Sequence, residues 1–165
     1  MEPTKFTLLK VIQLYETQSS RHSVMIVGKT LSGKSTTWRI LQKVQAKLAA
    51  DKEPGFFRVF DYPLNPKSVS LGELYGEFNI SSNEWTDGVL SSIMRTACAD
   101  DRPEYKWIIF DGPVDALWIE SMNSVMDDNK ILTLINGERI SMPDPVMLPA
   151  IIRRAGAFGS VSAKH

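Results

Sequence analysis

The stretch that decides the fold is SVMIVGKTLSGKST, residues 23–36. Its first part, Ser23–Val27, is a short apolar run between polar residues and a glycine, which predicts a buried β-strand that enters a tight loop. Its second part, Gly28–Ser35, fits the pattern G-x-x-x-x-G-K-[ST], and a helical pattern begins at Lys34. A strand, this loop and a helix in that order predict a phosphate-binding loop, or P-loop.

Each residue type in this loop has a chemical reason. Gly28 and Gly33 let the backbone fold so that successive N–H groups surround phosphate oxygens, and the helix N-terminus adds a favourable partial charge. Lys34 is expected to reach the β- and γ-phosphates of a nucleoside triphosphate, most simply ATP, and the Ser35 hydroxyl to coordinate Mg²⁺. The alternative interpretation is an ordinary turn that happens to contain Gly and Lys. The candidate nucleotide-binding residues are Gly28, Lys29, Thr30, Leu31, Ser32, Gly33, Lys34, Ser35 and Thr36.

A second motif is the apolar run Trp107–Phe110, which ends in Asp111. An acid at the end of a buried strand is a usual place for a carboxylate that holds Mg²⁺ through the water shell of the metal. Alone, such an acid is commonly a turn residue. Beside a P-loop, Asp111 becomes the second candidate metal residue, with Ser35.

The residue after Asp111 predicts the chemistry of the site. Many ATPases with this arrangement place Glu there to orient and deprotonate the attacking water, whereas this chain has Gly112 and then Pro113. Asp115 and Glu120 follow nearby, but an acid at a helix start is favourable for ordinary capping reasons. No catalytic residue is assigned, and we expect binding of Mg-ATP with little hydrolysis.

The rest of the chain alternates between predicted strands and helices. Because the strands are hydrophobic runs and do not alternate with polar residues, the pattern favours a mainly parallel sheet flanked by helices, hence the α/β class. Asn136-Gly137 predicts a two-residue hairpin turn, since both turn positions favour positive φ, and the hairpin is expected to project from the core. Besides the N-terminal helix, the predicted helices are Leu71–Phe78, Gly88–Ala99 and Asp115–Asp128, and the predicted strands are Phe56–Tyr62, Lys106–Phe110, Ile131–Ile135 and Glu138–Met142.

Length and composition limit the class of protein. A chain of 165 residues with 43% hydrophobic content fits one globular domain. Its 19 Lys and Arg balance its 19 Asp and Glu, so neither a nucleic-acid surface nor a membrane surface is predicted. The single Cys98 has no partner for an internal disulfide and is interpreted as a small hydrophobic residue, which favours a cytosolic setting.

Several longer segments resemble dynein heavy chains, in order along the chain: IVGKTLSGKST, PLNPKSVSLGELYGEF, EWTDGVLSS, KWIIFDGPVDALWIESMNSVMDDNK and LTLINGERI. More narrowly, the chain from about Pro3 to Pro145 resembles the second AAA+ module of the motor ring in axonemal dyneins. The resemblance implies an AAA+ fold and ATP with Mg²⁺, in a motor that moves along microtubules in cilia and flagella. In that family the second module is thought to hold its nucleotide without cycling it, and Gly112 agrees with this.

The resemblance also implies partners and a location. The partners would be neighbouring AAA+ modules of the same heavy chain and, indirectly, other dynein chains and microtubules, with no nucleic acid and no membrane. The location would be the cytoskeleton of the cytoplasm, in the axoneme of a cilium or flagellum. Trp118 and Met122 are interpreted as core residues and His22 as an ordinary loop histidine.

The chain departs from the family after about Pro145, where VMLPAIIRRAGAFGSVSAKH stands in place of a sensor strand, an arginine finger and a helical lid. Arg153 and Arg154 therefore receive no role. We divide the chain into an N-terminal helix and lead-in (1–22), a partial P-loop core (23–142) and a divergent, loose tail (143–165). A chain so divided resembles a fragment of a larger motor.

Two other functions remain open at this stage. A stand-alone small-molecule kinase would use the same P-loop with a basic lid, for which DDRPEYK, residues 100–106, is a thin candidate. An incomplete ring segment would keep the fold and bind no nucleotide.

Overall fold

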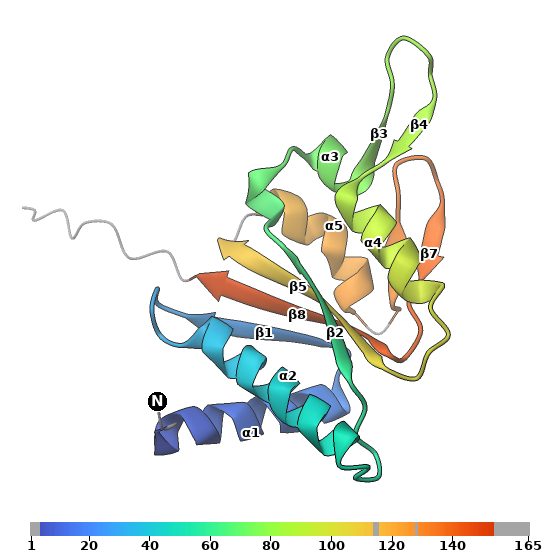
Figure 1. The fold of residues 1–165 in the computed structure, drawn as a ribbon. Helices are drawn as coiled ribbons and strands as arrows, with labels where there is room; N and C mark the ends of the chain where they lie inside the picture. The colour runs from blue at the N-terminus through green and yellow to red at the C-terminus, as the bar shows by residue number, and fades with distance from the viewer. Residues whose placement is uncertain (1–3, 114–115, 128, 154–165) are drawn as a thin grey trace, which may run out of the picture.

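The computed structural model describes residues 4–113, 116–127 and 129–153. A four-stranded sheet forms its centre, with the strand order β1-β8-β5-β2 (Figure 1). All neighbouring strands in it are parallel, so their carboxyl ends lie at the same edge of the sheet. This arrangement confirms the predicted α/β class. The strands are β1 (Ser23–Gly28), β2 (Val59–Leu64), β5 (Tyr105–Pro113) and β8 (Val146–Arg153).

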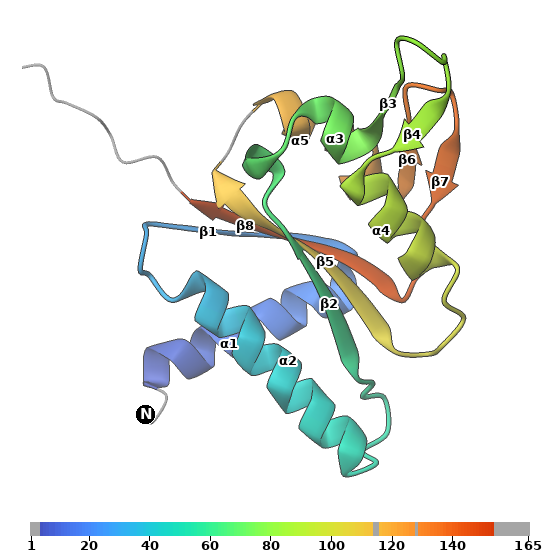
Figure 2. The same cartoon turned by 45° about the horizontal axis from the view of Figure 1, so that its top comes forward.

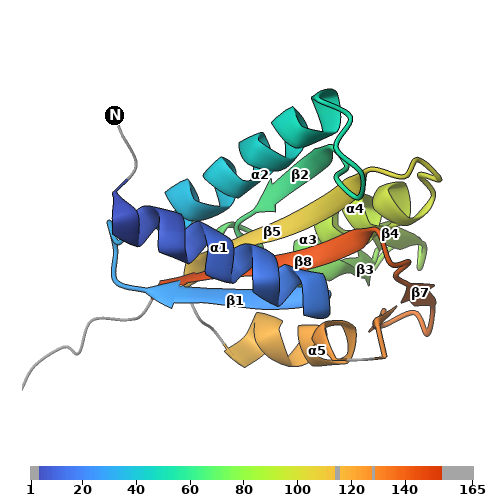
Figure 3. The same cartoon turned by 90° about the horizontal axis from the view of Figure 1, so that it is seen from below.

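Helices cover both faces of the sheet (Figures 2 and 3). The helices α1 (Lys5–Ser20) and α2 (Lys34–Ala50) pack on one face, and α3 (Leu71–Tyr75), α4 (Val89–Cys98) and α5 (Ala116–Met126) pack on the other. In β5, Trp107 and Ile109 point into the α1–α2 layer, while Ile108 and Phe110 point into the opposite layer. Both faces of the strand are therefore buried, which explains its continuous apolar sequence. None of the described helices is long and apolar enough to cross a membrane.

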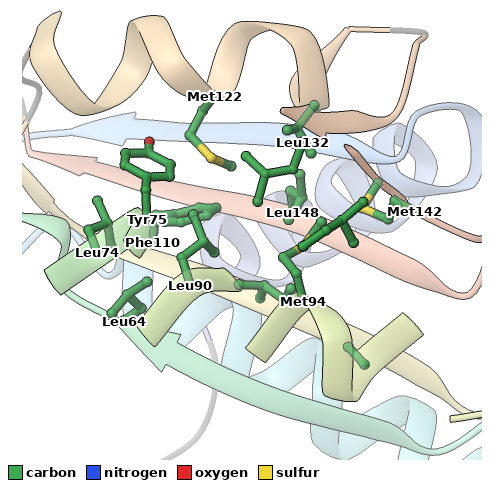
Figure 4. Packing of buried hydrophobic residues seen from close by; sticks show 14 of the residues in the cluster. Leu64, Leu74, Tyr75, Leu90, Met94, Phe110, Met122, Leu132, Met142 and Leu148 are labelled. Atoms are coloured by element: carbon green, nitrogen blue, oxygen red, sulfur yellow. The ribbon is translucent and has the colours of Figure 1, made fainter. Parts of the chain in front are cut away.

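The larger core lies between the sheet and α3, α4 and α5 (Figure 4). Met94, Met122 and Leu148 are fully buried in it. Trp118 stacks on Phe110 with ring centroids 5.6 Å apart. The interpretation of Met122 and Trp118 as core residues is therefore confirmed.

The helix predicted over Leu71–Phe78 ends early, at Tyr75. Gly76, with φ of 113°, ends the helix and begins strand β3 (Gly76–Phe78), which pairs with β4 (Trp85–Asp87) in an antiparallel hairpin. The apolar residues that suggested one more helical turn instead pair across this hairpin, since Phe78 contacts Trp85 at 5.2 Å between ring centroids. The prediction was wrong for its last three residues.

The predicted hairpin around Asn136-Gly137 is present, but with a different turn. It joins β6 (Ile131–Thr133) to β7 (Arg139–Ser141), and the Leu134 N–H donates to the Glu138 carbonyl at 2.8 Å. Three residues, not two, therefore form the loop, and of Asn136 and Gly137 only Gly137 has positive φ, at 85°. This is the common three-residue hairpin in which a single left-handed glycine closes the turn.

The tail expected from residue 143 onward is wrong for residues 146–153. These residues form β8, which lies between β1 and β5 in the middle of the sheet. Pro149 inside β8 has no N–H to donate, and a proline normally argues against a central strand. Between Trp107↔Met147 and Phe110↔Ala150 the ladder to β5 skips Leu148 and Pro149. Residues 154–165 lie outside the described part of the chain.

A proline also lies inside β2. The sequence predicted a strand over Phe56–Tyr62 that stops before Pro63, whereas β2 runs from Val59 to Leu64. The strand has only β5 as a neighbour, so a residue without an N–H can lie on its open side.

Candidate functional site

The loop after β1 has the backbone that its sequence predicts. Gly33 has φ of 81° and is the N-cap of α2, and its carbonyl accepts the N–H of Thr37 at 2.9 Å. A side chain at Gly28 would meet Ser32, because a Cβ there would lie 2.7 Å from the Ser32 Oγ. Glycine is thus favoured at position 33 by its positive φ, and a side chain at Gly28 would have to displace the Ser32 hydroxyl.

Lys34 lies folded over its own loop. Its Nζ donates to the carbonyl oxygens of Gly28 at 2.9 Å and Lys29 at 2.6 Å. These contacts hold the ammonium at the mouth of the loop, where an anion could replace carbonyl oxygens as its partner.

The loop and the candidate acid of β5 line one cavity. It has a volume of about 320 Å³ and is lined by Thr30, Leu31, Ser32, Gly33, Lys34, Ser35, Thr36 and Asp111. Its walls supply backbone N–H groups of the first turn of α2, which have no partner inside the helix, together with an ammonium, hydroxyls and one carboxylate. That donor set suits phosphate oxygens, and the hydroxyls with the carboxylate suit Mg²⁺. Gly28 and Lys29 do not line it.

Gly112 lies beside this cavity, is buried, and is covered by a residue that sequence reasoning missed. A Cβ at Gly112 would lie 2.8 Å from the Asn65 Oδ1 and 3.3 Å from Pro66 Cδ. The Asn65 oxygen is held in place because it accepts the Lys67 N–H at 3.1 Å. The only signal in the sequence was the Asn-Pro pair directly after an apolar strand, which reads as a turn.

Of the other residues considered from sequence, His22 and Glu120 lie away from the loop, whereas the backbone of Arg153 lies beside the first residue of the loop. The His22 Nε2–H donates to the Val125 carbonyl at 3.0 Å, so His22 ties the start of β1 to α5. Arg153 ends β8 opposite Gly28 of β1, and Arg154 and Asp115 lie outside the described residues. Glu120 lies on an exposed part of α5.

The segment 100–106, the thin candidate for a kinase lid, lies at the opposite edge of the sheet. It runs into the first two residues of β5, whereas Asp111 lies near the end of that strand. Lys106 is buried, and its Nζ donates to the carbonyls of Asp100 at 2.7 Å and Arg102 at 2.6 Å. The ion pair to Arg102 lowers the pKa of Asp100. These contacts fasten a tight connection, which does not suit a mobile lid.

Cys98 is half-buried at the end of α4, and burial raises the pKa of its thiol. A thiol with a raised pKa is a weak nucleophile at neutral pH, in agreement with its interpretation as a small hydrophobic residue. Within the described residues, no three His, Cys, Asp or Glu side chains gather as a metal cluster.

A parallel sheet whose first strand leads through such a loop into a helix defines a P-loop nucleotide-binding domain. Comparison with known families is consistent with this class. The family model described as "AAA domain (dynein-related subfamily)" matches residues 23–155, and the chain therefore belongs to that family. A second model, "Hydrolytic ATP binding site of dynein motor region", matches residues 1–35.

Curated relatives agree with the family models. Dynein axonemal heavy chain 2 of Homo sapiens is 61% identical over 94% of this chain. The dynein-1-beta heavy chain of the flagellar inner arm I1 complex of Chlamydomonas reinhardtii is 48% identical over 89%. In both cases the match covers 4% of the relative, so this chain spans a small part of their length. The resemblance to axonemal dynein heavy chains is confirmed.

Proposed function

We propose that this chain is a Mg-ATP-binding module of an axonemal dynein heavy chain that holds its nucleotide with little turnover. The observation that carries the proposal is the cavity of about 320 Å³ shared by the P-loop and Asp111. Next to it stands Gly112, where a hydrolytic site of this kind would need an acid.

Binding follows from the groups that surround the cavity. Backbone N–H groups from Thr30 to Ser35 would hold the phosphates, and Lys34 would exchange its carbonyl partners for β- and γ-phosphate oxygens. Ser35 and Asp111, which line the same cavity, would hold Mg²⁺, the hydroxyl as a direct ligand and the carboxylate through water. Magnesium, when bound, neutralises part of the phosphate charge.

Slow turnover follows from groups that the cavity lining does not supply. Among the described residues that line it, Asp111 is the only carboxylate and there is no Glu, His or Arg. A missing general base typically costs about 10²- to 10⁴-fold in rate. We therefore infer a structural or regulatory nucleotide site.

The finer assignment rests on sequence. We infer that the module is the second of the motor ring, because the segments from PLNPKSVS to LTLINGERI resemble that module. Its partners would then be the neighbouring modules of the same heavy chain and, through them, microtubules. Its place would be the axoneme of a cilium or flagellum, as the names of the relatives indicate for those proteins.

The test is the affinity of the purified chain for labelled ATP in the presence of Mg²⁺. Replacement of Lys34 with Ala removes a charged contact worth about 1.5–3 kcal/mol and should weaken binding about 10- to 150-fold. The matched control is Lys43→Ala, which removes an exposed lysine from the same helix and should leave affinity unchanged. Equal affinity of Lys34→Ala and the parent chain, with the fold intact by circular dichroism, would refute the P-loop assignment.

A further inference from the structure

A small cavity lies between α1, α2 and the start of β5, far from the P-loop. Its volume is about 50 Å³, and its walls include Gln18 of α1, Gln45 of α2 and Trp107 of β5. Tyr15 and Phe56 also line it, and their rings stack with centroids 6.0 Å apart. Three elements and a pair of stacked rings therefore line one space.

Three of the side chains that line this cavity are buried and carry unpaired polar atoms. Gln18 and Gln45 are each 5% exposed, and Trp107 is fully buried. Gln18 Nε2 and Oε1, Gln45 Oε1 and Trp107 Nε1 have no hydrogen-bond partner among the described residues. The cavity thus gathers two donors and two acceptors, contributed by three different elements.

We propose that this cavity is a built hydration site, which binds ordered water molecules between the two glutamines and the indole. An unpaired buried donor or acceptor costs about 1–3 kcal/mol, and four such atoms in one small space would outweigh the gain from packing two glutamines there. Water can donate and accept at once, which this mixed set of groups requires. A space of about 50 Å³ exceeds the roughly 10–15 Å³ that one water needs.

The site fastens α1 to the sheet. The buried apolar anchors of α1 are Val11 and Leu14, in the middle of the helix, whereas Gln18 lies in its last turn. Water held between Gln18, Gln45 and Trp107 adds a polar anchor at that end.

The direct test is NMR cross-relaxation between water and the Trp107 indole N–H in the parent chain, with the signal assigned by its loss in Trp107→Phe. A rotating-frame cross-peak with the sign of dipolar contact, not of chemical exchange, is the expected result. If the Trp107 indole shows no such contact with water, the proposal is wrong.

Substitution of the glutamines tests whether water occupies the cavity, because the free energy of unfolding should fall if water is bound there and rise if the cavity is dry. If water is bound there, Gln18→Met or Gln45→Met removes hydrogen-bond partners from the water and from the remaining polar groups. The unfolding equilibrium should then shift about 5- to 150-fold toward the unfolded state. The double variant should then cost less than the sum, because both partners leave together. In a dry cavity each Met would stabilise the fold, and that outcome refutes the proposal. The control is Gln13→Met, an exposed glutamine on α1, which should change little.

Discussion

Gly112 and Asn65 show how single residues decide what the site can do. Leu64 of β2 lies opposite Phe110 of β5, so Asn65, which follows β2, lies close to Gly112 near the end of β5. Asn65 occupies the space that a side chain at position 112 would need. Restoring the missing acid would therefore take more than one substitution, because the Asn65 side chain fills the space that it would need.

This contact predicts how Gly112 variants behave. Gly112→Ala should destabilise the chain by about 1–3 kcal/mol, the usual cost of overpacking, and Gly112→Glu should cost more without restoring hydrolysis. Asn65→Gly should relieve part of that cost, so the Gly112→Ala/Asn65→Gly double variant should be less destabilised than the sum of the single changes. Urea unfolding of the four chains measures this coupling.

The control for this cycle is Asn79→Gly, because the Asn79 oxygen accepts the Ser81 N–H at 2.9 Å much as Asn65 accepts that of Lys67. Asn79 lies in the β3–β4 hairpin, so its effect should add to that of Gly112→Ala. If the destabilisations caused by Asn65→Gly and Gly112→Ala are also additive, then Asn65 and a side chain at position 112 do not compete for space.

At the scale of elements, one arginine joins two hairpins. Arg95 of α4 donates from Nε to Asp87 Oδ2 at 2.9 Å, and from Nη2 to Glu138 Oε2 at 2.6 Å, with a second bond to the same Glu138 carboxylate from Nη1. Asp87 ends β4 and Glu138 precedes β7, so the guanidinium ties both hairpins to one helix. Hydrogen bonds from Arg95 lower the pKa of both carboxyls.

The lowered pKa values predict a pH dependence. A carboxyl whose folded pKa is depressed contributes stability above its unfolded pKa of about 4, and this stability is lost as pH falls through the folded value. Arg95→Met should therefore lower the free energy of unfolding at pH 7, and the difference from the parent chain should shrink between about pH 5 and pH 2. Thermal unfolding across this range measures it. The control is Lys43→Met, which removes an exposed cation from α2 and should leave the pH profile unchanged. If Arg95→Met instead lowers the free energy of unfolding by the same amount at every pH, the ion pairs do not explain its effect.

The elements also show where sequence reasoning works. The P-loop and the strand before Asp111 could be predicted because their signals are local: a run of apolar residues, glycines at fixed spacing and a helix start. β8 was missed because the loose tail was expected from the departure of the sequence from the family after about Pro145, and only the pairing with β1 and β5 reveals the strand. Asn65 was missed because its importance depends on Gly112, which is distant in sequence and adjacent across the sheet.

At the scale of the whole molecule, the nucleotide cavity and the other features lie at opposite ends of the parallel strands. The P-loop follows the end of β1 and Asp111 lies near the end of β5, at the carboxyl edge (Figure 1). The proposed hydration site, the connection 100–106 and the β6–β7 hairpin lie toward the other end of the sheet. Contacts at that end can hold the module together or meet neighbours without entering the nucleotide cavity.

The last prediction concerns this nucleotide cavity in the context of a complete motor. If slow turnover came only from missing neighbours, a complete heavy chain would restore hydrolysis at this site. If it comes from Gly112 and the closed space beside it, hydrolysis should stay negligible in both settings, since the arginine of a neighbour, worth about 10³- to 10⁵-fold elsewhere, does not replace a base. Single-turnover measurements with radiolabelled ATP distinguish the two, on this chain and on a heavy chain whose other P-loops are disabled. We expect bound ATP to persist in both. Rapid phosphate release that Lys34→Ala abolishes would show that a base outside the described lining completes the site.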